Sequence, residues 1–200
     1  MIKNKKVIPI LGIHGWKGNK ESFKSIAELF KIENADWIFP QAPYLVEKNK
    51  YSWSKETSKG KYEVKESIKY LNQFLQDSVL NKYKSKDINI IGFSQGAAIC
   101  YEYILRLPFQ FSGVYPISGF LRDQNIQEHL LHKKQKKTPI FIGHGKNDNI
   151  IPVKSSEKIY KILKKETKNV DIYLYNGGHK ISFDYIKQAR KRILNKVSEY

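Results

Sequence analysis

The sequence is poor in cysteine and lacks long apolar runs, and each shortage excludes a class of protein. A single cysteine, Cys100, rules out an internal disulfide and a multi-cysteine metal site. It also favours a reducing compartment, the cytoplasm. No apolar run approaches the roughly 20 residues that a membrane-spanning helix needs. The apolar stretch 7–13 follows several lysines, as a secretory signal would. It contains Pro9 and runs into His14 without a small-residue cleavage site, so we interpret it as a strand.

Arginine is scarce although the chain is strongly basic. Lysine and arginine number 36 against 19 acidic residues, for a net charge of +17, yet only four of the 36 are arginine. Proteins that read nucleic acid favour the bidentate guanidinium group of arginine, so we expect no specific nucleic-acid partner. The main interpretation is that the lysines lie on solvated faces, and attraction to an anionic lipid surface, to nucleic acid without sequence specificity or to acidic proteins stays open. The one dense lysine cluster, 133–137, is expected in a solvated loop.

Short β-branched runs alternate with segments of helical spacing along the chain. The expected strands are 7–13, 37–39, 88–93, 113–117, 140–142 and 170–175. The expected helices include 23–30 with Asn19 or Ser22 as N-cap, 64–79, 97–107 ending at Pro108, 159–163 and 183–197. This alternation predicts one α/β domain over residues 1–200, with a mostly parallel central sheet and helices on both faces. Such sheets place ligands at the carboxyl ends of their strands.

The strongest motif is G-x-S-x-G at 92–96, between an expected strand and an expected helix. A serine at a sharp strand-to-helix turn projects its hydroxyl above the sheet, and flanking glycines leave room for the turn. Ser94 is therefore the predicted nucleophile. The alternative is a plain turn in which Ser94 only caps the following helix.

A nucleophilic serine needs a base and an acid that orients the base. His179 follows two glycines after the last expected strand, and Asp148 lies in the loop after 140–142. By themselves, His179 could be an exposed loop histidine and Asp148 a turn residue. Their order along the chain, serine, acid and then histidine, is that of α/β-hydrolases and favours a catalytic triad.

The loop after the first strand completes this predicted site. A main-chain N–H from Trp16, together with that of Gln95, would form an oxyanion hole. His14 is expected to fix this loop as a structural residue. Cys100, four positions beyond Gly96, is expected to be a small core residue.

Together these residues resemble the carboxylesterase/phospholipase family of small serine hydrolases, which includes acyl-protein thioesterases and lysophospholipases. The matching pieces are Ile13-His14-Gly15, Pro40-Gln41-Ala42-Pro43, Ser52-Trp53, residues 92–97, residues 145–148 with Val153, and Gly178-His179. The resemblance implies an α/β-hydrolase fold and hydrolysis of small esters or thioesters through an acyl-enzyme, with no cofactor and no metal. It implies the same triad and the same oxyanion donors.

Three aromatic residues, Trp16, Trp53 and Phe93, are the candidate substrate contacts. The resemblance places Trp53 near the active site, and a bulky Trp16 would narrow the acyl site. The segments 43–61 and 118–137 are too short for a large lid, so we expect an open site. An acyltransferase or a peptidase on the same fold, and a non-catalytic basic binding protein on a hydrolase scaffold, remain alternatives.

Overall fold

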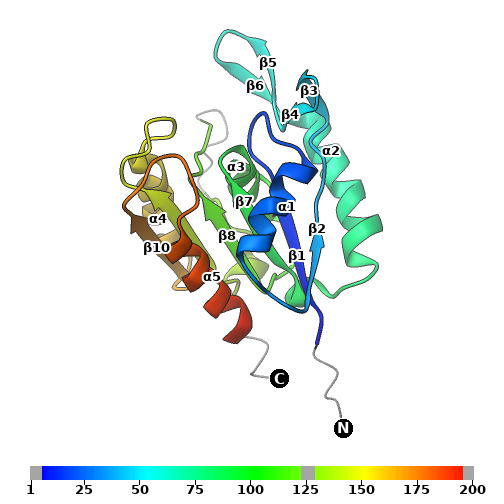
Figure 1. Ribbon diagram of the computed structural model, residues 1–200, viewed down its shortest axis with the longest axis vertical. Helices are drawn as coiled ribbons and strands as arrows, with labels where there is room; N and C mark the ends of the chain where they lie inside the picture. Colours follow the sequence, from blue (N-terminus) through cyan, green and yellow to red (C-terminus); the bar gives the residue numbers. More distant parts are fainter. Residues whose placement is uncertain (1–5, 123–128, 196–200) are drawn as a thin grey trace.

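The computed structural model describes residues 6–122 and 129–195, and its centre is a parallel sheet (Figure 1). The strands are β1 (Ile8–Ile13), β2 (Ala35–Ile38), β7 (Asn89–Phe93), β8 (Gly113–Ile117), β9 (Ile140–Gly145) and β10 (Val170–Tyr175). They lie in the order β10-β9-β8-β7-β1-β2, and all neighbouring pairs are parallel. The predicted mostly parallel sheet is confirmed. One domain over residues 1–200 stays a prediction.

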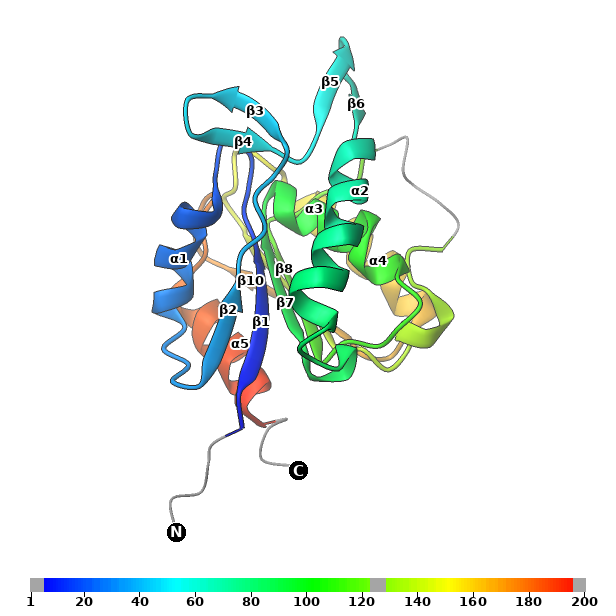
Figure 2. The same cartoon turned by 90° about the vertical axis from the view of Figure 1, so that its right-hand side faces the viewer.

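Helices cover both faces of this sheet, as predicted (Figure 2). One face carries α1 (Lys20–Leu29) and α5 (Phe183–Asn195), and the other carries α2 (Lys65–Phe74), α3 (Gln95–Glu102) and α4 (Val153–Glu166). Buried apolar side chains form two clusters, and Cys100 is fully buried in the larger one. The prediction that Cys100 is a core residue is therefore confirmed. No helix in the described parts of the chain is both long and apolar enough to cross a membrane.

Two expected helices differ in detail from the structure. The predicted helix 64–79 is α2 followed by a π-helical segment, η1 (Leu75–Leu80). The predicted helix 97–107 begins at Gln95 and ends at Glu102, before a 3₁₀ turn, η3 (Ile104–Arg106). The helix ends early because Tyr103 leaves helical dihedral angles, and its hydroxyl donates to Oδ1 of Asn72 at 2.8 Å. Two further 3₁₀ turns are η2 (Ser85–Asp87) and η5 (Lys133–Gln135).

Both N-cap candidates of α1 take part in its cap. The Asn19 side chain accepts the N–H of Ser22, and the Ser22 hydroxyl accepts the N–H of Asn19, so the two residues form a capping box. The C-terminal end of the expected helix 183–197 is not tested, because position 197 lies outside the described residues.

Two short β-hairpins, which the sequence did not predict, stand above the carboxyl edge of the sheet (Figure 2). They are β3 (Tyr44–Glu47) with β4 (Lys50–Ser52), and β5 (Lys55–Ser58) with β6 (Lys61–Glu63). The first is tied to the loop after β1, because Tyr51 donates its N–H to the Gly18 carbonyl at 3.0 Å. In the described part of the chain these hairpins are small structures, in agreement with the expectation of no large lid.

Candidate active site

Ser94 lies at a strained turn between β7 and α3. Its φ of 54° and ψ of −114° fall where non-glycine residues are rare. The turn also brings backbones unusually close together. A Cβ at Gly92 would lie 2.5 Å from the Gly96 carbonyl oxygen, and a Cβ at Gly96 would lie 2.1 Å from the Ile13 carbonyl oxygen. Both glycines of the G-x-S-x-G motif are therefore required by packing, and the alternative of a plain helix cap does not account for this geometry.

The structure brings Ser94, His179 and Asp148 together in one chain of hydrogen bonds. His179 Nε2 lies 3.0 Å from Ser94 Oγ, and His179 Nδ1 lies 2.8 Å from Asp148 Oδ2. Since a carboxylate only accepts, Nδ1 carries the proton, and the serine hydroxyl donates to Nε2. The Phe93 ring packs against the His179 ring with centroids 5.0 Å apart. This is the arrangement in which a histidine can take a proton from the serine.

The Asp148 carboxylate is fixed by main-chain donors. Oδ1 accepts the N–H of Ile150 at 3.0 Å and the N–H of Ile151 at 2.9 Å. Burial acts to raise the pKa of Asp148, but the main-chain hydrogen bonds and His179 outweigh it and lower the pKa. The acid is therefore ionised at neutral pH, as required to orient His179.

A second histidine, His144, also reaches the acid. Its Nε2 lies 3.3 Å from Asp148 Oδ2 and 2.9 Å from the Ile151 carbonyl oxygen, and its Nδ1 lies 2.6 Å from Ser156 Oγ. Burial is the largest effect on the pKa of His144 and lowers it, so the ring is neutral. The one sequence signal for this supporting contact is the position of His144, four residues before Asp148.

The loop after β1 lies directly against the nucleophile. A Cβ at Gly15 would be 3.3 Å from both the Phe93 carbonyl oxygen and Ser94 Cβ. Trp16 follows Gly15, and Gln95 follows Ser94 as the first residue of α3, where helical N–H groups lack intrahelical partners. The two residues predicted to supply oxyanion donors therefore lie beside Ser94.

His14 holds this loop and is buried. Its Nε2 accepts the N–H of Ala42 at 3.1 Å, and its Nδ1 lies 2.8 Å from the Gly15 carbonyl oxygen. Burial lowers the pKa of His14 to about 4, against a smaller opposite effect of the Gly15 hydrogen bond. The ring is therefore neutral and bridges two segments, as expected of a structural residue.

The prediction that Trp53 contacts substrate is wrong. Its side chain is fully buried, and its Nε1 donates to the His14 carbonyl oxygen at 2.8 Å. The Gln95 side chain holds the same segment, since its Oε1 accepts the N–H of Trp53 at 2.8 Å and its Nε2 donates to Ser54 Oγ at 2.8 Å. Trp53 therefore supports the loop after β1 from its buried side. No pattern in the sequence predicts the Gln95 side-chain contacts.

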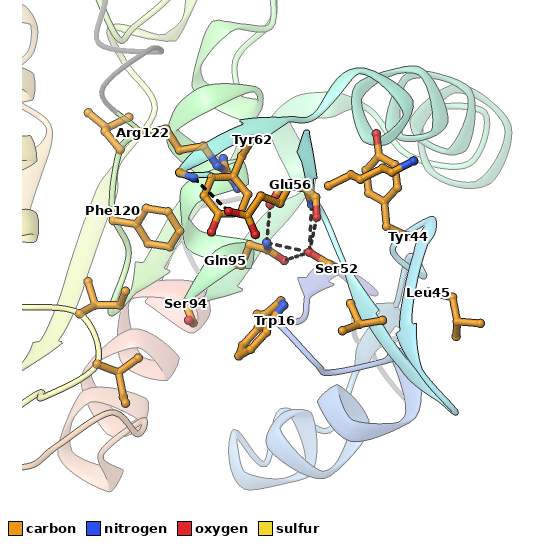
Figure 3. A pocket seen from close by; sticks show the side chains of 17 residues that line it. Trp16, Tyr44, Leu45, Ser52, Glu56, Tyr62, Ser94, Gln95, Phe120 and Arg122 are labelled. Atoms are coloured by element: carbon orange, nitrogen blue, oxygen red, sulfur yellow. Dashed lines mark hydrogen bonds between the residues drawn. The ribbon is translucent and has the colours of Figure 1, made fainter. Parts of the chain in front are cut away.

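A cavity of about 780 Å³ opens above Ser94 (Figure 3). Phe120 and Arg122 lie on one side of it, and Tyr44 and Leu45 lie on the other. Trp16, another predicted substrate contact, lines it and is 59% exposed. Phe93, the remaining candidate, packs on His179 and is not among the described residues that line the cavity.

Arg122 is held in the cavity wall by a buried acid. Its guanidinium group pairs with the Glu102 carboxylate at the end of α3, and its main-chain N–H donates to Glu102 Oε1 at 3.0 Å.

Residues 6–122 and 129–195 contain no group of three His, Cys, Asp or Glu side chains that could hold a metal ion.

Comparison with known families identifies the chain. The family described as Phospholipase/Carboxylesterase matches residues 3–197. The chain belongs to the phospholipase/carboxylesterase family. It is thus an enzyme of the ester-hydrolase class. The family resemblance stated from the sequence is confirmed.

Proteins from yeast and plants are similar to the chain over most of their length. Acyl-protein thioesterase 1 of Kluyveromyces lactis is 27% identical over 195 residues, which cover 88% of this chain and 86% of that protein. Carboxylesterase SOBER1 of Arabidopsis thaliana is 25% identical over 205 residues, covering 92% of this chain and 90% of the relative.

Solved structures of SOBER1 and of a bacterial carboxylesterase share the fold. The crystal structure of Arabidopsis thaliana SOBER1 superposes with a TM-score of 0.80 at 24% identity, covering 96% of this chain and 100% of that one. The Bacillus cereus carboxylesterase gives a TM-score of 0.78 at 22% identity, covering 98% and 91%. The predicted α/β-hydrolase fold is therefore confirmed.

Proposed function

We propose that Ser94, His179 and Asp148 act as a catalytic triad that hydrolyses carboxylic esters or thioesters through an acyl-enzyme. The observation that carries this proposal is the continuous hydrogen-bond chain, with 3.0 Å between Ser94 Oγ and His179 Nε2 and 2.8 Å between His179 Nδ1 and Asp148 Oδ2. The strained backbone of Ser94 supports it, because strain of this kind gathers at functional residues.

In the proposed mechanism, Ser94 Oγ attacks the substrate carbonyl carbon while its proton moves to His179 Nε2. Asp148 keeps the Nδ1–H tautomer and stabilises the imidazolium ion. The main-chain N–H groups of Trp16 and Gln95 would stabilise the oxyanion, each by about 3–4 kcal/mol. The proton on Nε2 then passes to the leaving alcohol or thiol. Water, activated by the same histidine, attacks the acyl-enzyme and releases the carboxylic acid.

The apolar side chains lining the cavity favour a substrate whose acyl group is apolar and binds there. Five of the eight large apolar side chains that are exposed in the described residues line this cavity. These are Trp16, Leu45, Val46, Tyr62 and Ile150. An apolar chain that covers them removes this surface from water, which favours binding by about 25 cal/mol per Å². The relatives named acyl-protein thioesterase make a thioester substrate a specific candidate.

The same exposed apolar side chains support a second candidate function, the hydrolysis of acyl groups that are presented at an anionic lipid surface. Its hairpins also carry lysines, including Lys55, and the whole chain has a net charge of +17. Turnover should then rise when the ester is presented on vesicles that contain an anionic phospholipid, and the rise should shrink as salt is added. Equal rates on neutral and anionic vesicles would reject this candidate. The cytoplasm remains the proposed location.

The test of the proposed function is hydrolysis of p-nitrophenyl esters and of acyl thioesters of increasing chain length. Ser94→Ala should lower kcat by about 10⁴-fold or more while leaving the thermal unfolding midpoint near that of the unmodified protein. Retention of most activity in Ser94→Ala would overturn the triad. Faster transfer of the acyl group to an added alcohol or amine than to water would favour an acyltransferase. Cleavage of peptides in preference to esters would favour a peptidase.

A further inference from the structure

The loop that carries His179 begins with an asparagine followed by a glycine, Asn176-Gly177, directly after β10. No other asparagine in the sequence precedes a glycine. This pair is chemically reactive, because the main-chain nitrogen of the second residue can attack the side-chain amide carbon of the first. Glycine leaves that nitrogen most accessible, since it has no Cβ and its backbone is the least restricted. Only Gly178 separates the pair from His179.

The two reacting groups are free of hydrogen bonds within the residues that the structure describes. Asn176 is exposed, and its side-chain amide has no hydrogen-bond partner among them. The Gly177 N–H likewise donates to none of the described groups. A hydrogen bond to either group would hold it back from the reaction. The structure therefore leaves both the attacking nitrogen and the amide carbon able to react.

Contacts with the end of β9 and the loop after it fix the chain on both sides of the reacting pair. Upstream, the Tyr175 carbonyl accepts a main-chain N–H of that loop at 2.8 Å. Downstream, the Asn147 N–H donates to the Gly177 carbonyl at 3.0 Å. A Cβ at Gly145 would lie 2.4 Å from the carbonyl oxygens of both Gly177 and Gly178, so the two segments are in close contact. The path to His179 therefore has no room for a longer main chain.

We propose that Asn176 is a site of spontaneous deamidation that withdraws His179 from Ser94. The Gly177 nitrogen gives up its proton and bonds to the side-chain amide carbon of Asn176. The amide group leaves with a proton as ammonia, and a cyclic succinimide remains. Water then adds to one of the two ring carbonyls and opens the ring. Opening at one carbonyl gives aspartate, and opening at the other gives isoaspartate, in which the main chain runs through the former side chain.

Isoaspartate displaces His179, because it adds one carbon–carbon bond of about 1.5 Å to the main chain. The His179 Nε2 lies 3.0 Å from Ser94 Oγ, and a misplacement of about 1 Å at a catalytic group can cost about a hundredfold in rate. Aspartate adds no main-chain bond and only places a charge at an exposed position, where salt screens it. Isoaspartate therefore inactivates the chain, whereas aspartate leaves it active.

The first test is storage of the full chain at mildly alkaline pH, where the main-chain nitrogen loses its proton more readily. Peptide mass spectrometry follows the exchange of the amide NH2 for OH, and chromatography separates the isoaspartate peptide from the aspartate peptide. We expect deamidation at Asn176 at least about tenfold faster than at Asn49 and Asn81, which are exposed and precede lysine. Equal rates at the three asparagines would overturn the proposal.

The second test is the steady-state kinetics of the same stored samples on a p-nitrophenyl ester. The kcat should fall in proportion to the fraction of isoaspartate at position 176, because the modified chains no longer turn over. The KM should stay constant, since the remaining chains are unchanged. Full kcat in a sample rich in this isoaspartate would overturn the proposal.

The matched control is Gly177→Ala, because a Cβ there meets its nearest atom at 3.5 Å, an ordinary contact. This variant should begin with the kcat of the freshly prepared protein. It should deamidate at least about tenfold more slowly, since the added Cβ hinders attack by the nitrogen, and should keep its kcat during storage. Loss of kcat in Gly177→Ala as fast as in the original chain would overturn the proposal.

Two variants of Asn176 separate the products. Asn176→Gln keeps an amide but cannot form the succinimide, so its kcat should survive storage. Asn176→Asp has the aspartate product from the start and should keep full kcat. If Asn176→Asp lost as much kcat as the stored protein, charge rather than chain extension would be the cause, and the isoaspartate route would be overturned.

The deamidation step is independent of the proposed function, whereas its effect on turnover rests on His179 being the base. The two failures are therefore distinguishable. Loss of turnover in Ser94→Ala together with slow deamidation at Asn176 would overturn this inference and leave the triad standing. Fast deamidation at Asn176 in a protein that Ser94→Ala leaves active would overturn the triad, and with it the withdrawal of His179 as the cause of any lost activity.

Discussion

The Nε2 atom of His144 lies 3.3 Å from Oδ2 of Asp148, the same carboxylate oxygen that His179 contacts at 2.8 Å. Together with the N–H groups of Ile150 and Ile151, this places donors around both oxygens of the acid. The carboxylate therefore has one orientation, and that orientation decides where His179 points. The proposed triad thus depends on a neutral histidine that is not itself among the described residues lining the cavity.

Replacing His144 should lower kcat more than it raises KM. His144→Ala removes a donor to a buried carboxylate, and hydrogen bonds to charged groups contribute about 1.5–3 kcal/mol, which corresponds to about a ten- to hundredfold fall in kcat. His144→Gln keeps a side-chain donor and should recover part of the loss. Steady-state kinetics on a p-nitrophenyl ester would measure kcat and KM for both variants. Ser156→Ala, which removes only the hydroxyl that contacts Nδ1 of His144, should have a smaller effect. An unchanged kcat in His144→Ala would show that Asp148 is held without it.

The glycines near the site should differ sharply in their tolerance of a methyl group. Gly96→Ala places a Cβ 2.1 Å from the Ile13 carbonyl oxygen, so the strand or the helix must move. Gly177→Ala, on the loop before His179, meets its nearest atom at 3.5 Å, an ordinary contact.

Urea unfolding would measure this difference. We expect Gly96→Ala to lower the free energy of unfolding by about 1–3 kcal/mol or more and to abolish ester hydrolysis. We expect Gly177→Ala to stay within about 0.5 kcal/mol of the unmodified protein. Similar losses in both variants would contradict the packing argument.

The sequence predicts the parts of this protein that rest on local signals. The apolar runs of the central strands, the turn at Ser94 and the order of Ser94, Asp148 and His179 along the chain are such signals, and the parallel sheet then brings the three residues to one edge. Confirmed family membership agrees with that interpretation.

The parts that the sequence did not predict depend on tertiary contacts. The hairpins at 44–63 are short and mostly exposed, and their apolar residues, such as the adjacent Leu45 and Val46, do not alternate with polar ones. No alternation therefore marks them as strands. The family resemblance places Trp53 near the site and makes it a candidate substrate contact, but its indole N–H donates to the His14 carbonyl oxygen from the buried side. Nothing in a sequence distinguishes the two faces of such a residue.

Gln95 should contribute to stability through its side chain as well as to the site through its main chain. Gln95→Ala leaves the N–H of Trp53 and the hydroxyls of Ser52 and Ser54 without their buried amide partner. An unsatisfied buried polar group costs about 1–3 kcal/mol, so the free energy of unfolding should fall by at least that amount. Chemical denaturation would measure it against Gln73→Ala, an exposed position on α2. If both variants unfolded alike, the Gln95 amide would have no structural role.

Stability should fall in mild acid because His14 is buried in its neutral form. The pKa of His14 is lowered to about 4 by burial, whereas an unfolded histidine has a pKa of 6.5. Between these values the unfolded state binds more protons than the folded state, so the free energy of unfolding rises with pH. The contribution of neutral His14 to that free energy is fully present above about pH 6.5. The full loss on acidification to below about 4 is about 3 kcal/mol. The lowered pKa of His144 acts in the same direction.

Urea unfolding at several pH values between about 7 and 4 would measure this slope. His14→Gln should be less stable at neutral pH and should show a smaller slope, with the remainder due to His144. His129→Gln, at a side chain that is 74% exposed, is the matched control and should keep the full slope. If His14→Gln and His129→Gln retained the same slope, the acid sensitivity would come from other groups, and the neutral His14 bridge between Gly15 and Ala42 would not be its cause.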